Sequence, residues 1–165
     1  MHRRVFIFMF AFEAVLFELA RLFLWPVTLG VLLSFLYAVY GLGAFGIEYL
    51  QRRRQPERAL VLGALADQGQ DRMELAVLKA LEGVRLCSRV APMLGLIATM
   101  IPMGPALVAV ASGESQGVAQ SLAPAFASVI VALASASITF VVYTVRRRWL
   151  MNELVMVLDA RERAS

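Results

Sequence analysis

The sequence predicts an all-α membrane protein with three transmembrane helices. Of its 165 residues, 60% are hydrophobic, and the mean hydropathy is +0.72. A soluble domain of this size does not need so much apolar sequence to fill its core. Three apolar runs are long enough for a hydrocarbon layer of roughly 30 Å, which about 20 helical residues cross. The predicted spans are Val27–Tyr49, Val90–Ala111 and Leu122–Val145.

Residues 1–26, which precede the first span, are predicted to form an amphipathic helix at the membrane interface. The run "VFIFMFAFEAVLFELARLFLWP" is as apolar as a span, but its charged side chains fall within a sector of about 140° on a helical wheel. These side chains are Glu13, Glu18 and Arg21. We expect Trp25–Pro26 to mark a turn into the first span. Residues 5–24 could instead form a fourth span or a signal sequence, although the glutamates and the lack of an A-x-A site argue against a signal.

Residues 50–89, between the first two spans, are predicted to form a helical hairpin, and residues 146–165 a helical tail. "PERALVLGALA" has helical apolar spacing, and Asp71 with Glu74 is suited to cap the hairpin's second helix. One helix face on the hairpin and an apolar stripe on the tail are interpreted as assembly surfaces. The hairpin face carries Leu75, Leu78, Glu82 and Leu86, and the tail stripe carries Leu150, Leu154 and Val157.

Arginines gather at one end of all three spans. "QRRRQPER" follows the first span and "RRRW" the third, while Arg85 and Arg89 precede the second. The positive-inside rule assigns this side to the cytoplasm. We therefore expect the inner (cytoplasmic) membrane, an external N-terminus, a cytoplasmic C-terminus and an external loop of residues 112–121. Only the arginines of "MHRR" depart from this pattern.

The remaining composition argues against several other functions. The net charge is +4, but the arginines sit at the ends of apolar runs, so they indicate topology and not nucleic-acid binding. Cys87 and His2 are the only residues of their types, so we expect no disulfide within the chain, no metal site and no cofactor. The sequence has no nucleophile–base pair and no phosphate-binding loop, so we do not expect an enzyme.

The second and third spans each carry small residues at spacings of three and four, as close helix approach in lipid requires. These residues are Pro92, Gly95, Thr99, Pro102 and Ala106 in the second span, and Ser128, Ala132, Ser135 and Thr139 in the third. One interpretation is tight packing, with the hydroxyls bonded to their own helical turn. The other is that these faces line a narrow passage. The element "PMGP" either shapes the external half of that passage or is a tolerated kink.

The run "APMLGLIAT" resembles the A-P-x-x-G-L-x-G-T motif of the MotA/TolQ/ExbB proton-channel family. The resemblance extends to the topology, and the "GPAL…SGE…SLAPAF…RRRW" run is most similar to short ExbB-like members. Two positions depart from the family. The glycine before the motif threonine is Ala98, and the T-x-x-G of the third span is Val129 to Ala132, where the adjacent Ser128 is a candidate substitute.

The resemblance implies the subunit of a proton-driven motor. Five copies would enclose a single-span ExbD-, TolR- or MotB-like partner whose transmembrane Asp carries the proton. None of the three spans has an ionisable residue in its middle, since Glu48 is at the cytoplasmic end of the first. The implied ion pathway comprises Thr99, Ser128, Ser135 and Thr139, with Thr99 best supported by the motif. A sodium-driven motor and a non-conducting scaffold remain alternatives. The altered third span slightly favours the scaffold, and the intact A-P-x-x-G-L-x-x-T run favours the motor more.

Overall fold

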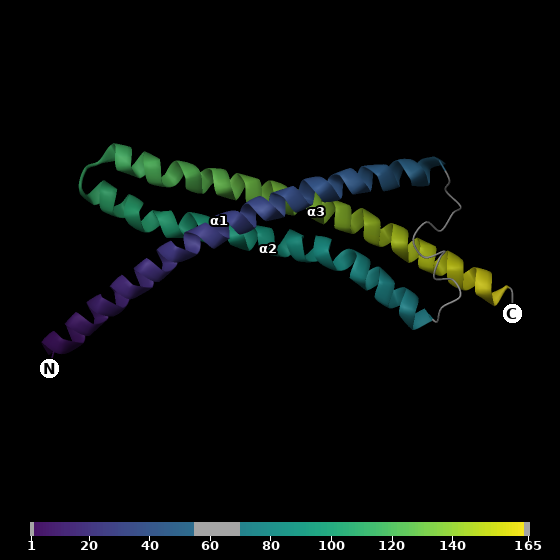
Figure 1. Cartoon of the computed structure of the whole chain (residues 1–165), viewed down its shortest axis with the longest axis horizontal. Coiled ribbons are helices and arrows are strands. Elements are labelled where there is room, and N and C mark those ends of the chain that lie inside the picture. Colours follow the sequence, from purple (N-terminus) through teal and green to yellow (C-terminus); the bar gives the residue numbers. More distant parts are fainter. Residues whose placement is uncertain (1, 55–69, 164–165) are drawn as a thin grey trace. The chain divides into compact units, whose positions relative to one another are not determined.

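A computed structural model describes residues 2–54 and 70–163 of the chain, and almost all of them belong to three α-helices. The helices are α1 (His2–Arg54), α2 (Gln70–Ala111) and α3 (Ser115–Glu162), as Figure 1 shows. No strand occurs in the described ranges. Each helix is long and apolar enough to cross a membrane. The predicted all-α class with three membrane-spanning helices is therefore confirmed.

The helices are much longer than a membrane is thick. They contain 53, 42 and 48 residues, which at 1.5 Å per residue correspond to about 80, 63 and 72 Å. The hydrocarbon layer accounts for only about 30 Å of each length. Each helix therefore has room for a span and for several further turns outside the hydrocarbon.

The first helix continues through Trp25 and Pro26, so the predicted turn at this point is wrong. Proline removes one backbone hydrogen bond from a helix interior. A turn inside the apolar run would leave several N–H and C=O groups without partners, which is more costly in lipid than one missing bond. The hydroxyl of Thr28, close to the proline, donates a hydrogen bond to the carbonyl of Leu24 at 2.8 Å. The interfacial position of residues 1–26 stays a prediction.

The chain divides into two compact units. Unit 1 comprises Met1–Leu33 and Ala91–Leu133, and unit 2 comprises Ser34–Val90 and Ala134–Ser165. Thr99 and Ser128 belong to unit 1, whereas Ser135 and Thr139 belong to unit 2. The predicted stripe of the third span is thus shared between the two units.

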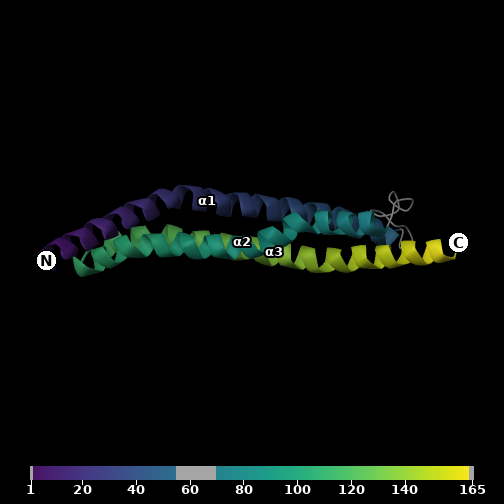
Figure 2. The ribbon, with the colours of Figure 1, turned by 90° about the horizontal axis from the view of Figure 1, so that it is seen from below.

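In unit 1 a short turn joins α2 to α3. Gly113 has φ of +77°, the left-handed conformation that glycine adopts without steric cost. The amide N–H groups of Ser112 and Glu114 donate to the carbonyls of Val108 and Ala109 at 3.0 and 2.9 Å, which satisfies the end of α2. Figures 1 and 2 show α2 and α3 running side by side from this turn. Helix α3 already begins at Ser115, so most of the predicted loop of residues 112–121 is helical.

Unit 2 contains an apolar core between α2 and α3. Its buried members are Met73, Val77, Leu81, Leu150, Leu154 and Val157. The tail stripe of Leu150, Leu154 and Val157, interpreted above as an assembly surface, therefore packs within the chain. Helix α2 has two apolar stripes, and the fold buries the one that contains Met73. Leu75, Leu78 and Leu86, on the other stripe, are each more than 60% exposed.

Candidate functional site

Helices α2 and α3 are in tight contact at Gly95 in unit 1. A Cβ atom built on Gly95 would lie 2.7 Å from the Cβ of Ala132 and 3.6 Å from the Cα of Val129. Ala132 is fully buried. A glycine on one helix and an alanine on the other let the two backbones approach, as small residues do between membrane helices. At this pair, the small residues of the two stripes pack against each other.

Beside this contact, α2 and α3 form a groove that contains Thr99, which we call the Thr99 groove. Its volume is about 520 Å³, and all of its lining residues come from α2 and α3. They are Pro92, Gly95, Leu96, Thr99, Met103, Leu122, Ala125, Phe126, Val129 and Leu133. Thr99 provides the only hydroxyl in this lining. Its Oγ1 donates a hydrogen bond to the carbonyl of Leu96 at 2.7 Å, so the hydroxyl proton is used within its own helix.

Ser128 lines a different cavity of unit 1, to which all three helices contribute. This cavity has a volume of about 310 Å³, and Pro102 and Arg21 also line it. The Oγ of Ser128 donates to the carbonyl of Pro124 at 3.0 Å. Arg21, assigned above to an interfacial face, is exposed and lines this cavity together with the polar residues Gln120 and Ser121.

Ser135 and Thr139 are buried in unit 2, with exposed fractions of 0% and 2%. The Oγ1 of Thr139 lies 2.7 Å from the carbonyl of Ser135 and 3.1 Å from that of Ala136, to which it can donate. Thr99 and Ser128 thus line two different cavities of unit 1, whereas Ser135 and Thr139 are buried side chains of unit 2. Of the other small residues in the second span, Ala106 is buried, and Pro92 and Pro102 are half-buried.

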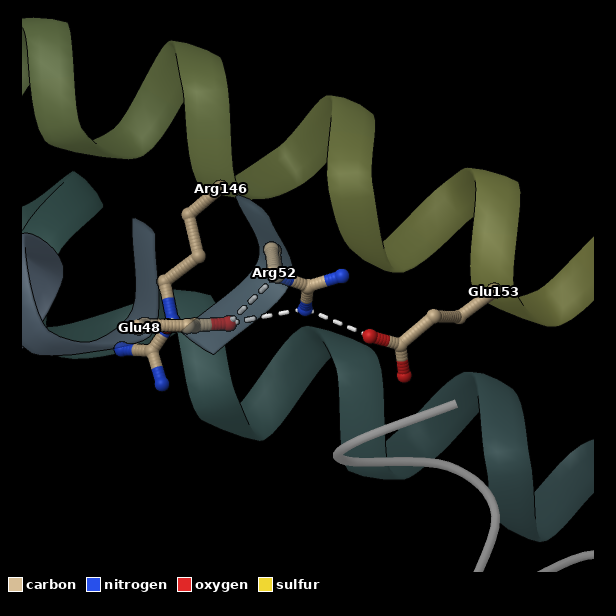
Figure 3. Close-up of polar contacts among 4 residues, drawn as sticks. All are labelled: Glu48, Arg52, Arg146 and Glu153. Atoms are coloured by element: carbon tan, nitrogen blue, oxygen red, sulfur yellow. Dashed lines mark hydrogen bonds and ion pairs between the residues drawn. The ribbon is translucent and has the colours of Figure 1, made fainter. Parts of the chain in front are cut away.

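A network of charged side chains connects α1 to α3 in unit 2 (Figure 3). Arg52 Nη2 lies 2.8 Å from Glu48 Oε1 and 2.5 Å from Glu153 Oε1. Arg146 Nε lies 3.1 Å from Glu48 Oε2. The Glu153 side chain is only 1% exposed, and its ion pair with Arg52 gives it the cationic partner that a buried carboxylate needs.

Aromatic rings lie beside this network. Phe45 and Trp149 stack with ring centroids 5.1 Å apart and planes 3° apart. The Arg52 guanidinium lies 4.9 Å from the centroid of the Trp149 ring, a cation–π distance. From the sequence, these arginines are interpreted only as topology signals. The spacing of Glu48 and Arg52, four residues apart, is the signal that could have revealed part of the network.

The Thr99 groove has no ionisable group in its lining. The predicted second and third spans also contain no Asp, Glu, Lys or Arg. In the part of the chain that the structure describes, no three His, Cys, Asp or Glu residues are placed to hold a metal ion. Any proton carrier at the depth of Thr99 therefore has to come from outside the predicted second and third spans.

Comparison with known proteins identifies a family. The model of the MotA/TolQ/ExbB proton channel family matches residues 46–159, a range that includes α2 and most of α3. No curated protein and no solved structure matches the chain significantly.

Proposed function

Since the chain belongs to the MotA/TolQ/ExbB proton channel family, we propose that it is the channel subunit of an ion-driven motor in the inner membrane. Five copies surround a single-span partner of the ExbD, TolR or MotB kind, and proton motive force drives that partner. The N-terminus is outside and the C-terminus in the cytoplasm. The observation that carries the proposal is the Thr99 groove of a family member, with one hydroxyl and no carboxylate in its lining.

The lining of the Thr99 groove suits a partner helix that brings its own Asp. The lining is apolar apart from Thr99, so it favours the apolar side chains of a membrane helix. An Asp on that helix would meet one hydrogen-bonding side chain per subunit. This arrangement supplies the ionisable group that both spans lack.

The hydrogen bond of Thr99 determines which form of that Asp it favours. A hydroxyl has one proton to donate and two lone pairs to accept with. The proton of Thr99 is already donated to the Leu96 carbonyl, so toward a partner Thr99 is an acceptor. A protonated Asp can donate to it, whereas an ionised Asp cannot. Thr99 thus favours the neutral, proton-carrying state of the partner.

A non-conducting scaffold is the second candidate. The contact at Gly95 and Ala132 supports it, as do the internal hydrogen bonds of Thr99 and Ser128, because a protein that only packs its helices needs no more than these features. A sodium-driven motor is a third possibility, since hydroxyl oxygens also bind that ion. Ion flux distinguishes the three candidates.

The decisive experiment measures proton flux in proteoliposomes that contain the chain and its partner, a single-span protein with a transmembrane Asp. Thr99→Val keeps the side-chain shape and removes the hydroxyl. Losing a hydrogen bond to a buried carboxylic acid costs about 1–3 kcal/mol, or about one to two decades in rate if it is fully felt in the transition state. We expect a loss of this size, and near-normal flux for Thr99→Ser.

Three controls complete this test. Ser128→Ala should cause a smaller loss, because Ser128 lines a different cavity. Asp→Asn in the partner should abolish flux, and native mass spectrometry should give five copies for the parent and for Thr99→Val. Normal flux in Thr99→Val would show that the hydroxyl only packs. If the parent shows no flux under either a proton or a sodium gradient, the result favours the scaffold. Flux under a sodium gradient alone would favour a sodium-driven motor.

A further inference from the structure

A second groove between α2 and α3, in unit 2, has a cationic rim. Its volume is about 1000 Å³, and its apolar lining includes the buried side chains of Val77 and Leu81. Four cationic residues and one acidic residue line it: Lys79, Arg85, Arg89, Arg147 and Glu82. We call it the basic groove. Its lining has a formal charge of +3, which requires an anionic occupant or a solvated rim.

The arginines of the basic groove differ from those of the neighbouring network. Arg52 and Arg146 are held by Glu48 and Glu153. Among the described residues, no ion pair involves Arg85, Arg89 or Arg147. These guanidinium groups are therefore free to bind an anion from outside the chain.

The depth of these arginines matches that of lipid headgroups. Arg89 directly precedes the apolar run of the second span, and Arg147 lies two residues beyond the end of the third. Arg85 is one helical turn before Arg89, about 6 Å along the axis. The headgroup layer is about 5–8 Å thick on each side of the hydrocarbon, so all three fall within it. Lys79, about 15 Å from Arg89, lies beyond it.

We propose that the membrane-proximal half of the basic groove binds the headgroup of an anionic phospholipid. Arg85 and Arg89 are four residues apart and share one face of α2, and Arg147 reaches the groove from α3. Guanidinium groups donate paired hydrogen bonds to phosphate oxygens, which an ammonium group cannot do with the same geometry. Basic pockets between transmembrane helices are suited to anionic headgroups. This inference does not depend on ion conduction.

The test measures lipid binding by the full-length protein. Native mass spectrometry in mild detergent compares bound phosphatidylglycerol with bound phosphatidylcholine as each lipid is added. We expect one tightly bound phosphatidylglycerol per chain and weaker binding of phosphatidylcholine. Each arginine near a membrane surface contributes about a fivefold gain in affinity for anionic lipid, so the triple variant R85Q/R89Q/R147Q should bind about a hundredfold more weakly.

A matched control separates the groove from general positive charge. R53Q/R54Q/R148Q removes the same charge from exposed residues that do not line the groove, and it should retain the tightly bound lipid. R85K/R89K/R147K keeps the charge, and hence the topology signal, but loses the paired geometry; its affinity should be intermediate. This variant keeps the test valid if the glutamine variant fails to insert.

Three lipid-binding results would overturn the proposal. In the first, the groove variants bind phosphatidylglycerol as tightly as the parent does, and in the second, the groove and control glutamine variants lose the same phosphatidylglycerol affinity. In the third, the parent binds phosphatidylcholine as tightly as phosphatidylglycerol. A cysteine placed at Arg85 that cross-links to a second copy in lipid would put protein in the groove, and this would also contradict it.

Discussion

Gly95→Ala is the most direct perturbation of the contact between α2 and α3. The new methyl carbon would lie 2.7 Å from the Cβ of Ala132, whereas ordinary contacts begin near 3.4 Å. The helices must therefore separate locally, and overpacking of this kind costs about 1–3 kcal/mol. Alanine also favours the helix over glycine by about 0.5–1 kcal/mol. The difference between these two effects is a net destabilisation of about 1 kcal/mol, within limits of about 0 and 2.5 kcal/mol.

The assay measures the apparent Tm in mild detergent. Unfolding is monitored by the reaction of Cys87, the only cysteine, with a fluorogenic maleimide. A loss of about 1 kcal/mol corresponds to a fall of about 2–4 °C for a chain of this length. The double variant Gly95→Ala/Ala132→Gly moves the methyl group from one helix to the other, so it should recover most of the loss. Coupling between the two substitutions, measured in a double-mutant cycle, isolates the contact.

Gly41→Ala provides the matched control, because nothing lies within 4 Å of a Cβ at Gly41. It should leave the Tm unchanged or raise it slightly, since only helix propensity changes. If Gly95→Ala behaves like this control, or if Ala132→Gly does not rescue it, then α2 and α3 are not in tight contact at this point.

Two further predictions concern unit 2. Glu153→Gln removes the charge that faces Arg52, while Glu48 remains. It should destabilise the protein by about 1–3 kcal/mol. An unchanged apparent Tm would show that the Arg52–Glu153 ion pair contributes nothing to stability. Leu150→Ala empties a fully buried core position and should cost about 2–5 kcal/mol, whereas Val155→Ala, at an exposed position of the same helix, should have little effect; equal Tm changes in the two variants would contradict the core assignment.

The class of the protein could be predicted because membrane spans depend on local composition. Each apolar run must be helical to satisfy its backbone in lipid, whatever its neighbours are. The same physics explains the error at Pro26. A proline suggested a boundary, but inside an apolar run the helix continues, because one missing hydrogen bond costs less than an open turn.

The sequence does not determine which face of each helix is buried. Helix α2 has two apolar stripes in unit 2, and the periodicity does not say which of them is buried. The fold buries the stripe of Met73 and leaves Leu75 exposed. The partner of a helix face is a tertiary property, so a helical wheel cannot identify it. The charged network of Glu48 and Arg146 was missed for the same reason, since its members come from different helices.

On the proposed mechanism, the apolar lining of the Thr99 groove couples protonation to movement. In a pentamer the five Thr99 side chains lie at one depth, and an Asp that passes from one to the next must cross apolar lining such as Phe126 and Leu96. A neutral carboxylic acid gives up one hydrogen bond for this step, which costs about 1–3 kcal/mol. An ionised Asp carries a charge into the same apolar surroundings, which costs at least about 2.5 kcal/mol. The partner therefore moves between subunits mainly in its protonated state, and each step requires the carrier to be loaded first.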